Sequence, residues 1–328
     1  MIRRFLALFE PFILALLGTV LLASVLPARG VLATVVEGAA TAGIVLLFFL
    51  HGARLSREAI WAGARHWRLH LAVLATTFLL FPLLGLGLSA LMAGPAAAGL
   101  LFLTLLPSTV QSSIAFTAIA RGNVAAAVCS ASFSNLAGIL ITPLLVALLM
   151  NGVGGGPGIS LASIESIVLQ LLVPFVAGHL ARPVIGGWLT RFKGLTGIVD
   201  RGSILLVVYA AFGAAVVEGL WHRVSATDLM LLGIACSLLL AIVLIVTRLA
   251  GRAMGLARED AIVLQFCGSK KSLAAGVPMA GVLFPAAQVG IVLLPLMLFH
   301  QIQLIACAVI ARRYAEQEQP AAIQPPVT

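Results

Sequence analysis

The sequence predicts an all-α polytopic membrane protein with ten transmembrane helices. Of its 328 residues, 61% are hydrophobic and 9% are charged, and the mean hydropathy is +1.14. A soluble globular domain usually carries about 25% charged residues, so the composition excludes a soluble fold. Each transmembrane helix takes ~20 residues, so ten of them leave roughly 130 residues for tails and loops. No second, soluble domain fits in that remainder.

Apolar runs separated by charged residues, Gly and Pro place the ten helices. Their predicted ranges are 9–27, 31–50, 69–93, 96–119, 124–150, 162–181, 202–220, 228–248, 260–283 and 287–311. The first run could instead be a signal peptide. We favour a membrane helix, because Glu10 and Pro11 interrupt that run and no A-x-A cleavage site follows.

The distribution of Lys and Arg tests this count, since cytoplasmic loops carry the excess of basic residues. With the N-terminus inside, the cytoplasmic tails and loops hold Arg3, Arg4, Arg54, Arg57, Arg65, Arg68, Arg121, Arg182, Arg191, Lys193, Arg201, Arg248, Arg252, Arg258, Arg312 and Arg313. The opposite side holds only Arg29 and Arg223. We therefore expect both termini in the cytoplasm and the chain in a bacterial inner (plasma) membrane. The net charge of +9 then reflects orientation and anionic headgroups, not a nucleic-acid partner.

A Gly-rich connector, NGVGGGPGISL at 151–161, divides the predicted helices five and five. An odd number in each half forces the second half to enter the membrane inverted, which is the layout of many secondary transporters. The sequence thus predicts inverted repeats over 9–150 and 162–311, with Pro11-Phe12 and Pro174-Phe175 as a weak echo between them. Residues 315–328 are expected to form a disordered tail.

The first cluster of polar residues inside the membrane spans 105–145, in the fourth and fifth predicted helices. Pro107 has no amide hydrogen, so we expect a broken helix whose freed backbone groups are satisfied by the polar residues that follow. Those residues are Ser108, Thr109, Gln111, Ser112 and Ser113. The fifth helix adds Ser130, Ser132, Ser134 and Asn135. The cluster predicts a binding site, although single serines can also serve close helix packing.

The second cluster lies at 264–281, in the ninth predicted helix. Gln265 and Gly268 precede Ser269, Lys270, Lys271 and Ser272, and Gly276 and Pro278 follow. Two adjacent lysines cannot both reach the interface from the middle of a straight helix, so we expect an unwound segment that lines a polar cavity. The alternative places the lysines in a loop, but it leaves only 273–283 in the membrane, too short to cross it.

Motifs of other function classes are missing from the sequence. It contains no HExxH pair, P-loop, CxxC or Rossmann fingerprint, which argues against ATP-driven transport and against familiar metal hydrolysis, and we do not expect an enzyme. Serines beside the two lysines are only a faint hint of Ser-Lys chemistry. The four cysteines are isolated in apolar stretches and predict neither disulfides nor a zinc site. We expect no cofactor other than a sodium ion.

The two clusters resemble those of bile acid:sodium symporters, and the match is closest to the SBF-like branch of that superfamily. It is carried by PSTVQSS at 107–113, ARGNVA at 120–125 and FCGSKKS at 266–272, together with FLHGARLS at 49–56. The resemblance implies a panel of helices 1, 2, 6 and 7 and a core of helices 3–5 and 8–10. Helices four and nine would break and cross in the core, with sodium behind the crossing. It places sodium ligands at Ser113, Ser132 and Asn135.

This chain departs from the symporter pattern at the crossing. The E-x-G-x-Q motif of bile acid symporters is replaced by Phe266 and Lys270 around Gly268, and Ile114 stands where the fourth helix usually offers Asn. Three oxygen ligands are missing and a cation is added, which would repel sodium. Lys270 could therefore be a built-in cation in the place of a lost sodium, either fixed or cycling with a proton.

The sequence thus predicts a secondary transporter of a small organic anion, coupled to sodium or protons and working by alternating access. Lysines and the N-termini of half-helices would favour negative charge. A non-transporting membrane regulator of ion homeostasis is the alternative. The identity of the anion, the coupling ion, the oligomeric state and which lysine faces the cavity stay open.

Overall fold

The structure is a computed structural model that describes residues 11–54, 66–92, 94–150, 165, 168–219 and 225–317. Every regular element in these ranges is a helix. The elements are α2 (Pro11–Val25), α3 (Val31–Arg54), α5 (Trp67–Ala75), η2 (Thr76–Leu80), α6 (Phe81–Ser89), α7 (Pro95–Leu105), α8 (Gln111–Ile119), α9 (Val124–Leu149), η3 (Val168–Leu172), α11 (Val173–Arg191), α12 (Lys193–Val217), α14 (Ala226–Ala253), α15 (Arg258–Gly268), α16 (Leu273–Leu283) and α17 (Ala286–Glu316). The predicted connector 151–161 and residues 318–328 of the predicted tail lie outside the described residues.

Seven helical stretches of the described chain are long and apolar enough to cross a membrane. They cover 31–54, 67–89, 124–149, 168–191, 193–217, 226–253 and 286–316. α2 is also apolar but has 15 residues. The predicted helices 96–119 and 260–283 are each divided into two short helices. The all-α polytopic class is confirmed.

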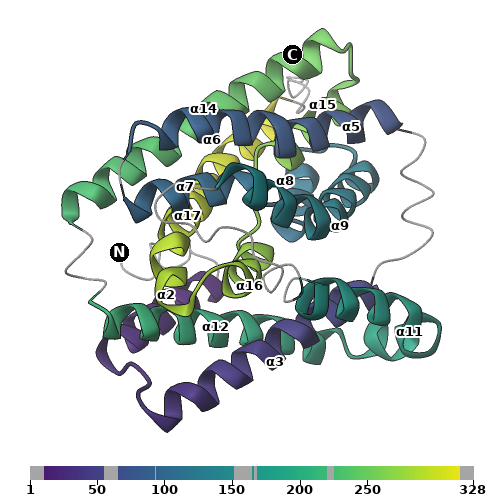
Figure 1. Cartoon of the computed structure of the whole chain (residues 1–328). Helices are drawn as coiled ribbons and strands as arrows, with labels where there is room; N and C mark the ends of the chain where they lie inside the picture. The colour runs from purple at the N-terminus through teal and green to yellow at the C-terminus, as the bar shows by residue number, and fades with distance from the viewer. Residues whose placement is uncertain are drawn as a thin grey trace, which may run out of the picture.

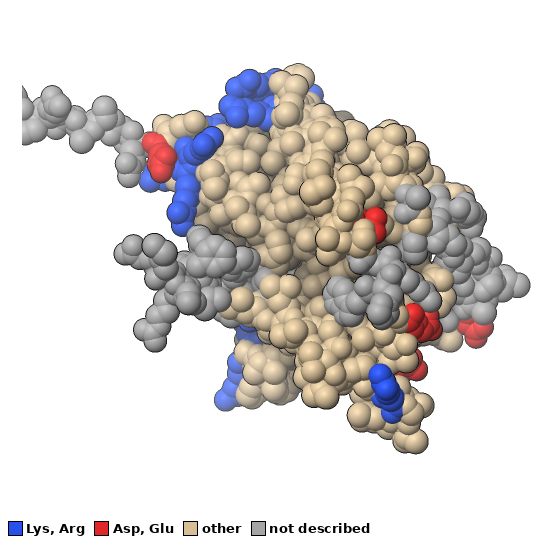
Figure 2. Space-filling model, turned by 90° about the vertical axis from the view of Figure 1, so that its left-hand side faces the viewer, with Lys and Arg blue, Asp and Glu red and all other residues tan. Residues whose placement is uncertain are grey.

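The surface is that of a protein surrounded by lipid. Val184 is 86% exposed and Val31 is 83% exposed, where a soluble protein would carry polar side chains. Figure 2 shows a broad face of described residues without charge, with most visible Lys and Arg gathered at one edge and most Asp and Glu at the other. Charges confined to the edges of an apolar face fit a chain that spans a bilayer.

The helices form two groups, which lie one above the other in the view of Figure 1. α2, α3, α11 and α12 pack against one another in one group, and α5 to α9, α14, α15 and α17 make up the other, with α16 between them. α3 and α11 approach closely through a reciprocal pair of glycines. A Cβ on Gly52 would lie 1.9 Å from Phe175 O, and a Cβ on Gly178 would lie 1.9 Å from Phe49 O. Glycine is therefore required at both positions.

Several helices are longer than predicted. α11 continues to Arg191 and α12 begins at Lys193, so the predicted loop 182–201 is helical except at Phe192. α17 likewise continues to Glu316, into the first residues of the predicted tail. The length of an apolar run reflects only the thickness of the hydrocarbon core of the membrane. Helical hydrogen bonding continues past that boundary, where basic side chains are solvated.

Candidate functional site

Two helix interruptions, at 106–110 and 269–272, meet at a place that we call the crossing. α7 ends at Leu105 and α8 begins at Gln111, while α15 ends at Gly268 and α16 begins at Leu273. Pro107 breaks the first helix because it lacks an amide hydrogen. The backbone amide of Ser272 donates to Pro107 O at 2.9 Å, and Ser108 Oγ donates to Cys267 O at 2.5 Å. The two breaks therefore hold each other in place.

Hydroxyl groups satisfy the backbone groups that the interruptions expose. Ser134 Oγ accepts the amide of Ser108 at 3.0 Å, and Thr142 Oγ1 donates to Leu105 O at 2.8 Å, both from α9. Ser113 Oγ donates to Phe266 O at 3.2 Å. Because an unpaired polar group is costly inside a membrane, these hydroxyls make non-helical backbone tolerable there.

The side chain of Lys271 is fully buried among backbone carbonyls. Its Nζ donates to Thr77 O, Thr104 O and Leu106 O, each at 2.7 Å. An ammonium has three donors, and all three are used. The ring centroid of Phe81 lies 4.2 Å from Nζ and covers the group. Lys271 is 0% exposed.

The carbonyls around Lys271 are available because the backbone is irregular at each of them. Thr77 is the second residue of the π-helix η2, in which the amide of Phe81 donates to Thr76 O and not to Thr77 O. Thr104 O loses its usual donor because the amide of Ser108 donates to Ser134. Leu106 has an extended conformation just after α7. The three oxygens therefore point at the lysine with no helical partner of their own.

Gln303 of α17 holds the backbone of the same residue. The Lys271 amide donates to Gln303 Oε1 at 2.9 Å, and Gln303 Nε2 donates to Lys271 O at 3.0 Å. Gln303 Nε2 also lies 2.9 Å from His300 Nδ1. One buried amide thus pairs with both backbone groups of Lys271 and fixes where its side chain begins.

Lys270 has different partners from those of Lys271. Its Nζ donates to Ser112 O at 2.9 Å and lies 4.0 Å from the ring centroid of Phe116 and 5.4 Å from that of Phe266. Lys270 is also 0% exposed. The ion pairs within the described residues are Arg54 with Asp200 and His66 with Asp260, so neither lysine has a carboxylate partner there. Carbonyl dipoles and aromatic rings face the two lysines instead.

A cavity of about 750 Å³ reaches the N-terminus of α8. α3, α11 and α12 line most of it, and α8 contributes Gln111, its first residue. The charged lining residues are Arg54, Arg182, Lys193 and Asp200. Asp200 forms an ion pair with Arg54. The lining that the structure describes therefore carries more positive than negative charge.

Comparison with known proteins places the chain in a family. The sequence profile described as the SBF-like CPA transporter family matches residues 10–316, almost the whole chain. The chain belongs to the SBF-like CPA transporter family. The predicted resemblance to this branch is confirmed, and the polytopic architecture is that of a transporter family.

Individual relatives of this SBF-like chain agree with that assignment. The chain is 57% identical over 317 residues to "Uncharacterized protein PA2026" of Pseudomonas aeruginosa, and 53% identical over 316 residues to "Putative symporter YfeH" of Escherichia coli. Each of these alignments covers 95% of both chains. It is 27% identical over 274 residues to sodium/bile acid cotransporter 7 of Rattus norvegicus, which covers 81% of this chain and 80% of the relative.

The structure brings many of the predicted site residues of the SBF-like chain together. Ser108, Ser113 and Ser134 contact the breaks directly, and Ser112 accepts from Lys270. Ser269 Oγ donates to Gln265 O at 2.5 Å, and the side chain of Gln265 accepts from Tyr314 at 2.5 Å. Ser269 and Gln265 therefore stabilise the break between α15 and α16 through these hydrogen bonds.

Other predicted residues lie apart from the lysines. Ser130 Oγ lies 2.7 Å from His70 Nδ1, which joins α9 to α5. Ser132 and Asn135 are half-buried. Within the described chain, hydrogen bonds do not join either of them to Ser113, whose hydroxyl contacts Thr109 and Phe266 O. A sodium site at Ser113, Ser132 and Asn135 stays a prediction.

Two of the predicted hinge residues need correction. α16 continues through Gly276 and Pro278, and the interruption lies before it, at 269–272. Ser272 caps this helix, accepting the amide of Ala275 at 3.1 Å. A Cβ on Gly276 would lie 2.5 Å from Leu106, so this glycine serves close packing. The sequence indicated the break near Gly268 correctly but extended it too far.

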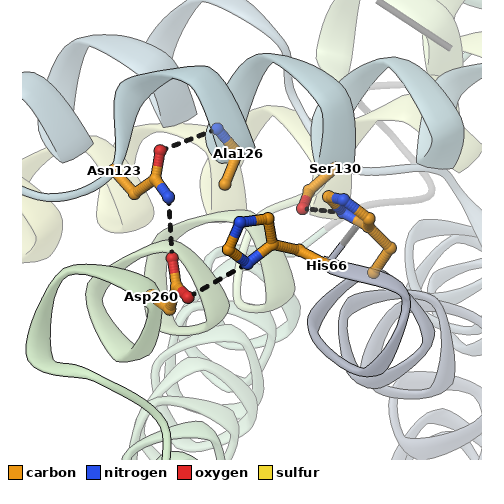
Figure 3. A network of polar contacts seen from close by, with 6 residues as sticks. His66, Asn123, Ala126, Ser130 and Asp260 are labelled. Carbon is orange, nitrogen blue, oxygen red and sulfur yellow. Dashed lines mark hydrogen bonds and ion pairs between the residues drawn. The ribbon is translucent and has the colours of Figure 1, made fainter. Parts of the chain in front are cut away.

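The ARGN motif forms a tight turn between α8 and α9. Arg121 has a positive φ of 56°, and a Cβ on Gly122 would lie 2.6 Å from Ile262. Asn123 caps α9 by accepting the amide of Ala126 at 3.0 Å, and it donates to Asp260 at 2.9 Å (Figure 3). Asp260 also lies 3.3 Å from His66. The motif thus ties the α8–α9 turn to the start of α15.

Sequence reasoning missed several residues of the crossing. Thr77 and Thr104 act through backbone oxygens, which the residue type does not reveal, and their signal is only a polar residue in an apolar run. Gln303 gave a clearer signal, because Gln301 and Gln303 are amides in a largely apolar helix. Its pairing with Lys271 could not be seen without the fold.

Proposed function

We propose that the chain is a secondary active transporter of a small organic anion and that it works by alternating access. The cavity described above is the observation that supports this proposal most. It connects basic side chains on α3, α11 and α12 with Gln111, the first residue of the half-helix α8. Gln111 is followed by Ser112, whose carbonyl binds Lys270. The cavity therefore ends next to the crossing.

Charge and helix geometry favour an anion in this cavity. Three of the charged lining residues that the structure describes, Arg54, Arg182 and Lys193, are basic, and one, Asp200, is acidic. The N-terminus of α8 adds backbone amides and the positive end of a helix dipole. The relatives named symporter and sodium/bile acid cotransporter support a transported solute.

The proposed mechanism uses the two groups of helices as moving parts. In it the chain has ten membrane helices in two inverted repeats, a panel of α2, α3, α11 and α12 and a core that holds the crossing. The cavity has lining residues from both groups, and three of the half-helices beside the breaks, α7, α8 and α15, lie in the core group. Rocking of the core against the panel would close this cavity and open the opposite side.

For the coupling ion, the arrangement favours a proton over sodium. Within the described chain, the Ser113 hydroxyl already has protein partners, and the ammonium of Lys271 binds three carbonyls that could otherwise bind a metal ion. Lys270 uses one of its three donors. We propose that Lys270 carries the proton, because loss of its charge would leave few buried partners unsatisfied.

Uptake into proteoliposomes tests the proposal. Radiolabelled taurocholate, pyruvate and succinate sample large and small organic anions. An Arg182→Ala, Lys193→Ala double variant should reduce uptake of the transported anion at least tenfold. Arg248→Ala, on the exposed side of α14 away from the cavity, should leave uptake unchanged. Equal uptake by the double variant and the wild type would reject the cavity as the anion route.

A pH gradient tests the coupling in the same vesicles. With the membrane potential clamped, an inwardly directed proton gradient should accelerate uptake by the wild type. Lys270→Met should abolish that acceleration while the protein stays folded. Acceleration that persists in Lys270→Met would assign the proton to another group.

A further inference from the structure

The surroundings of Lys271 Nζ have the composition of a cation site. The three oxygens at 2.7 Å are all backbone carbonyls, and they come from two different segments, η2 with its start at Thr76 and the end of α7. Carbonyl rings of this kind replace the hydration shell of alkali ions in channels. We propose that these carbonyls form an alkali-metal cation site and that the ammonium of Lys271 permanently occupies it.

The backbone irregularities build this site before the lysine enters it. Each carbonyl is free because of a feature of its own segment: the π-helix at η2, the diversion of the Ser108 amide to Ser134, and the extended conformation of Leu106. None of these features involves Lys271. The oxygens would therefore remain directed at the same point if the side chain were shortened.

Electrostatics at this point favour a positive occupant. Thr104 and Leu106 lie at the C-terminus of α7, the negative end of a helix dipole. The face of the Phe81 ring, 4.2 Å away, also attracts a cation. Three buried carbonyls without a donor would be costly to leave empty. An alkali ion of similar size and equal charge is the natural replacement for an ammonium.

Lys270 does not share these features, which gives a matched control. Its Nζ has one carbonyl partner and two aromatic rings. Ser112 lies inside α8, so its carbonyl keeps a helical partner when the lysine is removed. Truncation of Lys270 should therefore create no cation site, whereas truncation of Lys271 should create one.

Thermal unfolding of the purified chain in detergent tests the inference. Wild type, Lys271→Ala, Lys271→Met and Lys270→Ala are titrated with NaCl, KCl or LiCl against choline chloride at constant ionic strength. Lys271→Ala should gain saturable, cation-specific stability, with a rise in Tm on the order of 5 °C at about 100 times Kd. Wild type and Lys270→Ala should show none. Lys271→Met should show none either, because its side chain fills the space without charge.

Each outcome decides the inference. A folded Lys271→Ala variant that responds equally to all cations, choline included, overturns it. If that variant cannot be isolated, the wild type decides. Saturable stabilisation of the wild type by one alkali ion contradicts a permanently filled site, and its absence supports one.

The consequence for transport rests on the proposed function, but the site itself does not. Uptake by the wild type should be independent of sodium, and uptake by Lys271→Ala should become cation-dependent. A chain that moves no anion could still show the cation-dependent stability of Lys271→Ala. Failure of the proposed function is thereby separated from failure of this inference.

Discussion

Lys270 and Lys271 are adjacent in sequence and equally buried, yet their surroundings differ in kind. Lys271 is bound by three carbonyls with no helical partner, and Gln303 fixes its backbone. Lys270 has one carbonyl and two rings. The difference teaches that two buried charges side by side can have separate roles. Lys271 satisfies the backbone carbonyls of the crossing. Lys270 donates one hydrogen bond to the described residues and has further N–H donors available.

Removal of the two charges should show the largest difference. Lys271→Met leaves three buried carbonyls without donors and should lower the free energy of unfolding by about 3 kcal/mol or more, at ~1 kcal/mol for each. Lys270→Met places an apolar side chain between aromatic rings and should change it by no more than about 1 kcal/mol. Unfolding in mixed micelles measures both. Equal losses would erase the distinction between the lysines.

Gln303→Leu tests the attachment of Lys271 through its backbone. It removes two buried hydrogen bonds and leaves the amide and carbonyl of residue 271 unpaired, so we expect a loss of about 2 kcal/mol. Gln301→Leu on the same helix is the control, since Gln301 is half-buried and makes no side-chain hydrogen bond within the described chain. The pair of variants can be compared by the same unfolding measurement. A larger loss for Gln301→Leu would contradict this account of Gln303.

Phe116→Leu should have the smallest effect and should act on Lys270 alone. The ring centroid lies 4.0 Å from Nζ, and leucine keeps the apolar packing but loses the cation–π contact, which we expect to contribute about 1 kcal/mol. A double-mutant cycle with Lys270→Met should give a coupling of roughly 1 kcal/mol. The corresponding cycle with Lys271→Met should give a coupling near zero. Coupling of Phe116 to Lys271 instead would show that the two sites are not separate.

Much of the fold followed from the sequence for simple physical reasons. A bilayer has a fixed thickness and rejects unpaired polar groups, so apolar runs and Pro107 indicated the helices and the first break. The extension of α11 to Arg191 was missed because helices continue beyond the apolar run. The sequence also could not indicate that Pro278 lies within a continuous helix.

The candidate site was predictable only in part. Polar residues in apolar runs pointed to the region of Ser108, Ser134 and Lys271, because such residues are rare and expensive in a membrane. The hypothesis of a built-in cation named Lys270, whereas the contacts favour Lys271 for that role. The positions of free backbone oxygens determine which of the two lysines is bound. The directions of these oxygens depend on a π-helix and a broken helix, which the local residue types do not reveal.

The measurement that tests the central claim most directly is anion uptake by wild-type proteoliposomes with sodium, potassium or choline outside. The pH and the membrane potential are held equal in the three conditions. If Lys271 supplies the cation of the crossing, the three initial rates will agree within error. A rate that rises saturably with external sodium would contradict the claim.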